Sequence, residues 1–401
     1  MHQEFLGNLV FLPEIYGTYP HFYYRYSIMT GIYLHIPFCA TRCVYCAFYS
    51  TTMASLRHRY VNALCREMAL RPLHDSVSTV YLGGGTPSQL SPQELVLLFQ
   101  GLREAYGSFG PEVEVTMECN PEDLTPEYCD VLALLPVNRV SMGVQTFDNK
   151  RLRFLRRRHS GEQVGNAMCL LRSVGIHNVS IDLMFGFPSQ TLAEWETDLT
   201  QAIALAPEHI SAYNLTYEKG TPLNGMLRRG EIEELDDELS RAMYESLIDH
   251  LVDAGYDHYE ISNFALPSYH SRHNSAYWHE VPYVGLGAAA HSYDIETRSW
   301  NVADIMDYVQ AVECGKLPCE IETLNLSTRY NDLVTTALRT SEGIDLDQLR
   351  QRYGYTYYIY ILRMSLPHIR RGVLSLSHGH LSLTRQGLFV SDDIMSDLMY
   401  V

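Results

Sequence analysis

Between residues 31 and 216, short runs of apolar and β-branched residues alternate with longer stretches whose apolar residues recur every three or four positions. The short runs predict strands, and the longer stretches predict amphipathic helices. The expected strands are Gly31–Ile36, Thr79–Leu82, Glu112–Glu118, Arg139–Gly143, Asn178–Leu183 and His209–Leu215. Six strands that alternate with helices predict an α/β fold with a parallel sheet, and we expect a partial (β/α)6 TIM-like barrel.

Two of the intervening helices are expected at Arg57–Leu70 and Pro92–Tyr106. The second has a clear start, because Ser91 is followed by proline at the first helical position and then by Glu94, which together form a capping box. Functional residues of such barrels lie at the carboxyl ends of the strands. We therefore expect the chemistry of this chain at that end of the sheet.

The pattern changes twice after the barrel core, which we expect over residues 29–220. Residues 221–322 predict a less regular extension of this core with a long helix at Glu233–Asp253. Residues 323–401 combine helical runs with a hairpin whose turn is Gly379. These elements are expected at Tyr330–Thr340, Leu346–Tyr353, Tyr357–Arg371 and Leu374–Leu383. Helices followed by a short hairpin predict a small C-terminal winged-helix-like domain.

The first 28 residues are dense in Tyr and Phe and have no clear periodicity. They lack the basic start and continuous apolar core of a signal peptide. We expect Met29 to be the natural start and residues 1–28 to be an extension. The alternative is an aromatic docking segment.

Composition narrows the class of protein. A formal net charge of −17 argues against a general affinity for nucleic acid, which needs clustered positive charge. No run of 18 apolar residues is present, so we expect no membrane span. Nine cysteines without a secretory signal are typical of a reducing compartment, and we expect a cytoplasmic protein.

Three of the cysteines carry the strongest signal. Cys39, Cys43 and Cys46 have the spacing C-x3-C-x2-C and follow the first predicted strand. Cysteine thiolates hold iron–sulfur clusters, and three of them leave one iron of a [4Fe-4S] cube open for another ligand. A zinc site would need a fourth protein ligand, and no second cysteine pair lies nearby. The cluster is therefore favoured over zinc and over three buried structural cysteines.

This motif, with Tyr45 inside the last gap, resembles that of the radical S-adenosylmethionine (SAM) superfamily. The resemblance implies that the open iron binds the amino and carboxylate groups of SAM. It also implies that Gly83-Gly84-Gly85-Thr86-Pro87 corresponds to the glycine motif that holds the methionyl amino group, so Gly84, Gly85 and Thr86 are cofactor-binding candidates.

Polar residues near other predicted strand ends complete the expected SAM site. Glu118 and Gln145 are candidates for the ribose hydroxyls and the methionyl group, and Arg157 matches the family position that contacts the SAM carboxylate. Asp182 and Tyr33 are expected at the same end of the barrel. The remaining arginines around Arg157 are interpreted as a solvated helix face.

Further motifs are similar to those of the oxygen-independent coproporphyrinogen III oxidase group, and the similarity runs from about Gly31 to the C-terminus. The dehydrogenase branch, HemN, has a fourth cysteine where this chain has Phe48; the HemW branch, regarded as heme chaperones, has phenylalanine there. His273-Asn274-Ser275-Ala276-Tyr277-Trp278 fits the H-N-x-x-Y-W motif associated with heme binding in HemW-like proteins. Histidine is a common axial ligand of heme iron. The alternative is a packed core histidine.

The resemblance thus implies a HemW-like heme chaperone that binds a [4Fe-4S] cluster and SAM and delivers heme to a heme-requiring acceptor protein. A respiratory protein is the family-level expectation for that acceptor, and a homodimer is plausible. The resemblance also implies that residues 323–401 form a HemN-type C-terminal domain. The main alternative is a coproporphyrinogen III dehydrogenase that acts by radical oxidative decarboxylation, so the sequence leaves open whether the chain is an enzyme. A third reading is a cluster-bearing structural protein without SAM, which conflicts with the glycine loop.

Overall fold

The computed structural model describes residues 30–73 and 75–401. Six parallel strands, in the order β1 to β6, form its centre. Their bounds are Thr30–Ile36, Val77–Gly84, Glu114–Cys119, Arg139–Gln145, Asn178–Phe185 and His209–Asn214. All six expected strands and the α/β barrel class are confirmed. The expected start at Met29 and the segment before it lie outside the described residues.

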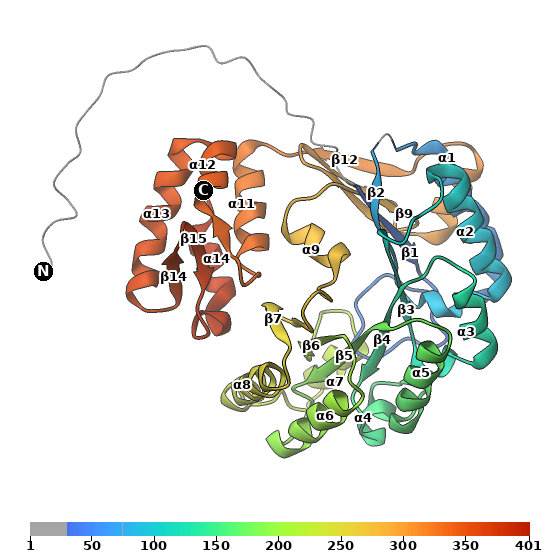
Figure 1. The fold of residues 1–401 in the computed structure, drawn as a ribbon, viewed down its shortest axis with the longest axis horizontal. Coiled ribbons are helices and arrows are strands. Elements are labelled where there is room, and N and C mark those ends of the chain that lie inside the picture. The colour runs from blue at the N-terminus through green and yellow to red at the C-terminus, as the bar shows by residue number, and fades with distance from the viewer. Residues whose placement is uncertain (1–29, 74) are drawn as a thin grey trace, which may run out of the picture.

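Helices connect the six strands and cover the outer face of the curved sheet (Figure 1). They are α1 (Arg57–Leu70), α2 (Pro92–Tyr106), α3 (Pro126–Ala133), α4 (Asn149–Phe154), α5 (Gly161–Ser173) and α6 (Leu192–Ala204). The bounds of α1 and α2 are as expected, and Ser91 and Glu94 form the capping box in both directions. Because both faces of the inner strands are covered, residues such as Ile32, Leu34 and Ile36 of β1 are fully buried.

The segment expected as an irregular extension adds six strands to the same sheet, whose order is β12-β11-β10-β9-β1-β2-β3-β4-β5-β6-β8-β7. The added strands are β7 (Asp257–Glu260), β8 (Asn263–Ala265), β9 (Tyr283–Leu286), β10 (His291–Asp294), β11 (Thr297–Asn301) and β12 (Cys319–Thr323). Helices α7 (Pro222–Arg228) and α8 (Asp237–Asp253) precede these strands, and α9 (Arg272–Trp278) and α10 (Ile305–Glu313) lie between them. These strands have three to five residues each, too short for a clear alternation.

The C-terminal part has a core of its own, built around Tyr330, Ile361 and Leu381. Its helices are α11 (Leu326–Ala337), α12 (Leu346–Tyr353), α13 (Tyr355–Arg370) and α14 (Ser391–Leu398), and its strands are β13 (Ile344–Asp345), β14 (Leu374–Ser377) and β15 (His380–Leu383). The hairpin around Gly379 and the helices before it confirm the winged-helix-like expectation. The predicted start of α11 at Tyr330 is wrong, because Asn325 caps the helix by accepting a hydrogen bond from the Thr328 amide (2.9 Å).

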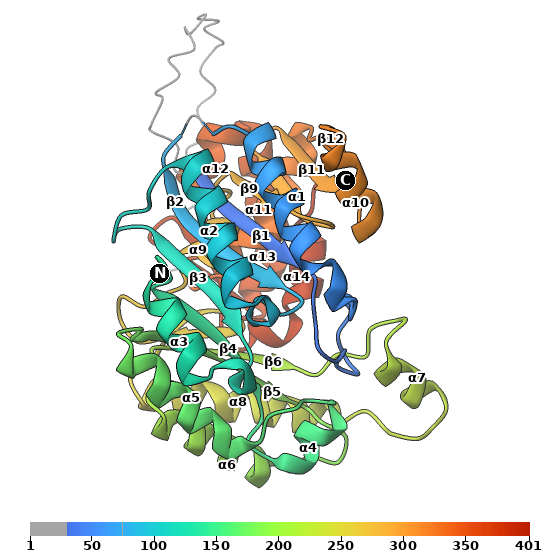
Figure 2. The same cartoon turned by 90° about the vertical axis from the view of Figure 1, so that its right-hand side faces the viewer.

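Helix α9 lies in the opening of the curved sheet, between the barrel and α11 (Figure 1), and α7 lies on a loop that projects from the barrel (Figure 2). Within the two described ranges, no helix has both the length and the apolar character needed to cross a membrane.

Candidate functional site

The three cysteines lie on the loop that follows the carboxyl end of β1. Two backbone hydrogen bonds close this loop on itself: the Cys39 amide donates to the Thr51 carbonyl (2.9 Å), and the Thr51 amide donates to the Pro37 carbonyl (2.7 Å). All three cysteines are free and partly exposed. Burial raises the pKa values of the Cys39 and Cys46 thiols, so a bound metal must supply the charge that stabilises their thiolates.

The donor set of this loop fits an iron–sulfur cluster better than a single ion. Within residues 30–73 and 75–401, no three His, Cys, Asp or Glu side chains converge closely enough to hold one metal ion. A four-iron cube binds each thiolate through a different iron atom, so its cysteines do not have to converge on one point. Phe48, two residues after Cys46, is 71% exposed beside this loop.

The glycine loop after β2 packs directly on the segment that leads to the cysteines. The Gly85 amide donates to the Ile36 carbonyl (2.9 Å), and a Cβ atom at Gly85 would lie 2.7 Å from the Pro37 carbonyl carbon. Gly84 has φ +111°, which disfavours other residues. Thr86 then places its Oγ1 3.6 Å from Cys39 Sγ. The loop therefore needs glycine for close approach to the cysteine segment, and Thr86 contacts one of the cysteines.

Glu118, near the end of β3, faces the barrel interior beside this loop. Its carboxylate accepts hydrogen bonds from the Tyr81 hydroxyl (2.8 Å) and the Gly84 amide (3.2 Å). Burial raises the pKa of Glu118 to about 7, and the nearby Asp182 carboxylate adds to the rise. A buried carboxyl with this pKa is suited to a cationic ligand, whose charge would favour the ionised form.

Arg157 reaches the same end of the barrel from the turn after α4. Its guanidinium donates to Asn120 Oδ1 (2.6 Å) and to the Gly143 carbonyl, and Nη1 lies 3.9 Å from Cys43 Sγ. Gln145 follows at a bulge of β4, buried and with φ +69°. Left-handed backbone at a non-glycine residue is strained and is often found at ligand sites.

Asp182 and Tyr33 lie deeper in the barrel than the sequence indicated. Strand β5 continues to Phe185, so Asp182 is inside the strand rather than at its end, and Ser141 Oγ donates to it (3.3 Å). Burial raises the pKa of Asp182 to about 6. The Tyr33 ring lies beside the rings of Tyr81 and His273 (centroids 6.2 and 6.5 Å away), and its hydroxyl bonds His35 Nδ1 (3.1 Å). Both residues line the interior below the cysteine loop.

His273 lies at the opposite end of the barrel from the cysteines. Its Nδ1 bonds Thr79 Oγ1 (2.8 Å) and its backbone amide donates to Glu114 Oε1 (2.9 Å), and both partners are near the starts of their strands. β1 has 7 residues, which at ~3.3 Å per residue separates the two ends by about 20 Å. The expectation that all the motifs share one end of the barrel is therefore wrong for His273, which reaches the barrel on α9 rather than from a strand end.

Both nitrogens of the His273 ring form hydrogen bonds. Its second nitrogen, Nε2, bonds the Tyr277 hydroxyl (2.8 Å), and only 1% of the residue is exposed. Burial lowers the pKa of His273 to about 3, so the imidazole is neutral at physiological pH. To coordinate iron, this side chain would have to give up one of its two hydrogen bonds.

A column of aromatic side chains joins the two ends. The Tyr81 ring stacks on the His273 ring (centroids 5.0 Å apart), and its hydroxyl is the donor to Glu118. Tyr277 continues the column, since its ring meets that of Tyr283 edge-on at 4.6 Å. Tyr81, Asn120 and Tyr283 were not among the predicted site residues. The sequence does contain a signal for Tyr81. It lies two residues after Thr79, and side chains two residues apart face the same side of a strand.

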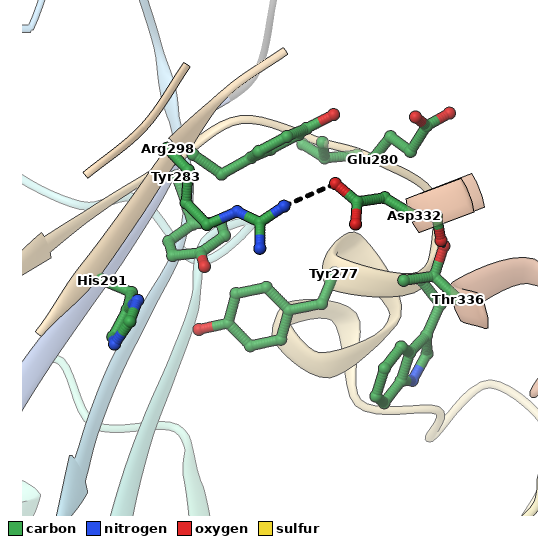
Figure 3. A pocket seen from close by; sticks show the side chains of 10 residues that line it. Tyr277, Glu280, Tyr283, His291, Arg298, Asp332 and Thr336 are labelled. Atoms are coloured by element: carbon green, nitrogen blue, oxygen red, sulfur yellow. Dashed lines mark hydrogen bonds and ion pairs between the residues drawn. The ribbon is translucent and has the colours of Figure 1, made fainter. Parts of the chain in front are cut away.

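A cavity of about 370 Å³ lies beyond this column, between the barrel part and α11 (Figure 3). Its walls include Tyr277 and Trp278 from α9, Tyr283 from β9, and His291 and Tyr293 from β10. Arg298 from β11 and Asp332 from α11 form an ion pair across it (2.6 Å). Aromatic walls with a few charged groups are typical of a small-molecule site.

Two family models match the chain. Residues 33–202 match the Radical SAM superfamily, and residues 324–390 match the HemN C-terminal domain. The first match contains the cysteine and glycine loops and the strands that carry Glu118, Gln145 and Asp182. The second covers the separate core of the C-terminal part.

The chain is also similar to curated proteins over most of its length. It is 34% identical over 326 residues to the heme chaperone HemW of Lactococcus lactis, covering 81% of this chain and 85% of that protein. It is 31% identical over 371 residues to the heme chaperone HemW of Bacillus subtilis, covering 91% and 98%. Among solved structures, coproporphyrinogen III oxidase (HemN) of Escherichia coli has a TM-score of 0.81 at 22% identity and covers 94% of this chain and 91% of that one. That last likeness concerns the fold alone.

Proposed function

We propose that this chain, which belongs to the HemW family of the radical SAM superfamily, binds heme and delivers it to a heme-requiring acceptor protein. The observation that carries the proposal is the similarity to curated HemW heme chaperones at 31–36% identity. The aromatic cavity beside the H-N-x-x-Y-W motif adds physical support, because it can cover an apolar macrocycle.

The [4Fe-4S] cluster would be held by Cys39, Cys43 and Cys46, as membership of the radical SAM superfamily implies. When bound, the cluster can hold SAM at its open iron and supply an electron. Thr86 and Arg157 lie beside two of these cysteines, and both can donate hydrogen bonds to a cluster or to a SAM carboxylate. Glu118 and Gln145 would bind the remaining polar groups of SAM, and Gly84 and Gly85 would let the backbone approach it.

His273 would contribute to heme binding by positioning. Its Nε2 orients the Tyr277 hydroxyl, and its buried ring holds α9 against the barrel. Through these contacts it would set two walls of the cavity, Tyr277 and the neighbouring Trp278.

The alternative, coproporphyrinogen III dehydrogenase activity, has less support. The HemN structure shares the fold at 22% identity, and the exposed Phe48 replaces the additional cysteine of the dehydrogenase branch. We also propose a reducing compartment such as the cytosol, because all nine cysteines are free. A respiratory acceptor and a cluster-dependent homodimer remain proposals drawn from the family resemblance.

The experiment that tests the proposal is an anaerobic heme titration of the cluster-loaded protein, followed by its Soret absorbance. We expect a saturable shift near one heme per chain, and transfer of that heme to an apo-acceptor on mixing. A shift that does not saturate, together with turnover of coproporphyrinogen III, would contradict the chaperone function and support the alternative.

A further inference from the structure

The cavity between the barrel part and α11 contains an imidazole to which no role is assigned. His291 is the only histidine among the residues that line this cavity in the described part of the chain. We propose that His291 is the ligand of the heme iron and that the macrocycle lies in this cavity against Tyr277 and Tyr283. This inference rests on the proposed function and adds where the heme binds and which residue holds its iron.

The two histidines near the cavity differ in the hydrogen bonds and the burial of their rings. Both nitrogens of His273 are hydrogen-bonded and its ring is buried, so iron could reach it only after a bond to Thr79 or Tyr277 is broken. His291 is exposed, and its ring forms no hydrogen bond to any residue of the described ranges. A neutral imidazole with a free nitrogen lone pair is what heme iron takes from a protein. Because its ring is exposed and forms no hydrogen bond to the described residues, His291 is favoured over His273 as the ligand of the heme iron.

The backbone holds His291 in place without occupying its ring. His291 begins β10, where it pairs with Trp300 of β11. The residue before it is fixed by a hydrogen bond from the Asn301 amide to the Ala290 carbonyl (2.9 Å). On the neighbouring strand β9, a Cβ atom at Gly285 would overlap the His291 carbonyl, so only glycine lets β10 approach this closely. A ligand carried by paired strands keeps its position better than one on a free loop.

The surroundings of His291 suit the rest of a heme molecule. The hydroxyl end of Tyr277 lies on the side of the cavity where His291 lies (Figure 3), and this hydroxyl bonds His273 Nε2 (2.8 Å), which leaves the His291 ring unbonded among the described residues. The rings of Tyr277 and Tyr283, 4.6 Å apart at 75°, offer one face and one edge to a flat macrocycle. The cavity volume of about 370 Å³ is within the usual range of roughly 300–1,000 Å³ for small-molecule sites.

Two donors in the cavity wall suit the carboxylates of the heme propionates. Arg298 points its guanidinium into the cavity and is paired with Asp332 at a half-buried site, with 35% and 33% of the two side chains exposed. A propionate can share or take over this guanidinium, since its geometry fits a carboxylate. The indole nitrogen of Trp278 is buried and has no hydrogen-bond partner among the described residues, and a rotation of its ring toward the cavity would make it a second donor.

The test compares His291→Ala with His273→Ala and with the control His58→Ala, which removes an exposed histidine of α1 that is remote from the cavity. Each variant, loaded with its cluster, is titrated with ferric heme, and the iron ligand field is recorded by optical and electron paramagnetic resonance spectra. We expect His291→Ala to change the ligand-field spectrum and to weaken heme binding at least about tenfold. His58→Ala should behave like the wild type.

A rescue experiment separates ligation from a structural role. In His291→Gly, added imidazole should restore the wild-type ligand-field spectrum, which it would not do if the histidine only supported β10. An unchanged spectrum in His291→Ala, with the change appearing in His273→Ala instead, would overturn the inference and leave the proposed function standing. If the wild type shows no saturable heme binding while its cluster is intact, the proposed function itself fails, and this inference fails with it.

Discussion

At the scale of single residues, Glu118 has the most informative titration. Its pKa is raised to about 7 by burial and by Asp182, whereas its hydrogen bonds from Tyr81 and Gly84 oppose the rise. SAM carries positive charge, so it should bind the ionised carboxylate better than the protonated one. Binding of SAM should therefore strengthen as pH rises through 7 and release part of a proton.

The predicted size of this effect follows from the fraction of Glu118 that is ionised. If only the carboxylate form binds, SAM affinity should rise roughly tenfold between pH 6 and pH 8. Anaerobic calorimetric titration of the cluster-loaded protein would measure it. Glu118→Gln should bind SAM more weakly and remove this part of the pH dependence, since the amide does not titrate. Parallel pH profiles for the two proteins would show that Glu118 is not in the SAM site.

Cys43 is a second residue whose role can be isolated. Cys43→Ser should abolish assembly of the full cluster and leave the barrel folded, because the side chain lies on a surface loop outside the main buried core. The broad visible absorbance of the reconstituted protein measures the cluster, and far-ultraviolet circular dichroism measures the fold. Cys314→Ser is the matched control, because Cys314 is an exposed thiol far along the chain. Full cluster absorbance in Cys43→Ser would contradict the ligand assignment.

At the scale of elements, α9 is capped by Ser271, which accepts from the Asn274 amide (3.3 Å), and by a carboxylate of β3. Glu114 accepts the backbone amides of Arg272 (3.0 Å) and His273 (2.9 Å), so it caps the N-terminus of this seven-residue helix. Such a cap satisfies amides that have no partner within the helix and places negative charge at the positive end of the helix dipole. Without it, a helix this short has little stability of its own.

Glu114→Ala should therefore loosen α9 and with it the walls of the cavity. We expect the free energy of unfolding to fall by about 1–3 kcal/mol and heme binding to weaken, with the cluster retained at the other end of the barrel. Urea unfolding and heme titration would measure the two effects. The control is Glu112→Ala, because Glu112 is exposed and its side chain contributes no hydrogen bond to α9. Equal losses in both variants would rule out the capping role.

The elements themselves were predictable to different degrees. The six strands of the barrel are long and β-branched, and α1 and α2 have full amphipathic periods, so local patterns were enough. Strands β7 to β12 were missed because each has only three to five residues and is specified by its neighbours in the sheet. The same holds for α9, whose place in the barrel opening depends on Glu114, more than 150 residues earlier.

At the scale of the whole molecule, ion pairs join the barrel part to the C-terminal part. Arg339, after α11, binds Glu260 of β7 at 2.9 Å, and the Glu260 carboxylate is 1% exposed. Arg339 also lies over the Trp278 ring, 5.1 Å from its centroid, and so supports a wall of the cavity. Arg385 and Asp249 form a second such pair (2.6 Å), but both are about half exposed.

The burial of each ion pair should determine how much that pair contributes to the free energy of unfolding. Arg339→Ala leaves one oxygen of a buried carboxylate without its charged partner, and we expect it to cost about 1–3 kcal/mol of the free energy of unfolding. Arg385→Ala should cost less than about 1 kcal/mol, because an exposed pair is screened by water and salt. Thermal and urea unfolding of the two variants would measure the difference. Equal costs would mean that burial of Glu260 contributes nothing to the junction.

The sequence by itself determined the barrel, its six strands, the C-terminal hairpin domain and the loop that carries the three cysteines. These features depend on periodicity, on turn residues and on spacings within a few residues. Each such signal is contained in a short segment of the chain.

Only the tertiary structure decided that His273 lies at the opposite end of the barrel from the cysteines and that both its ring nitrogens are occupied. The same is true of the cavity, which gathers residues from Tyr277 to Thr336 on two helices and three strands. The physical reason is that such contacts form between segments far apart in the chain, whose register and approach are set by packing and by buried polar partners. In this protein, local pattern located the motifs, and packing determined which of their side chains are free to bind a ligand.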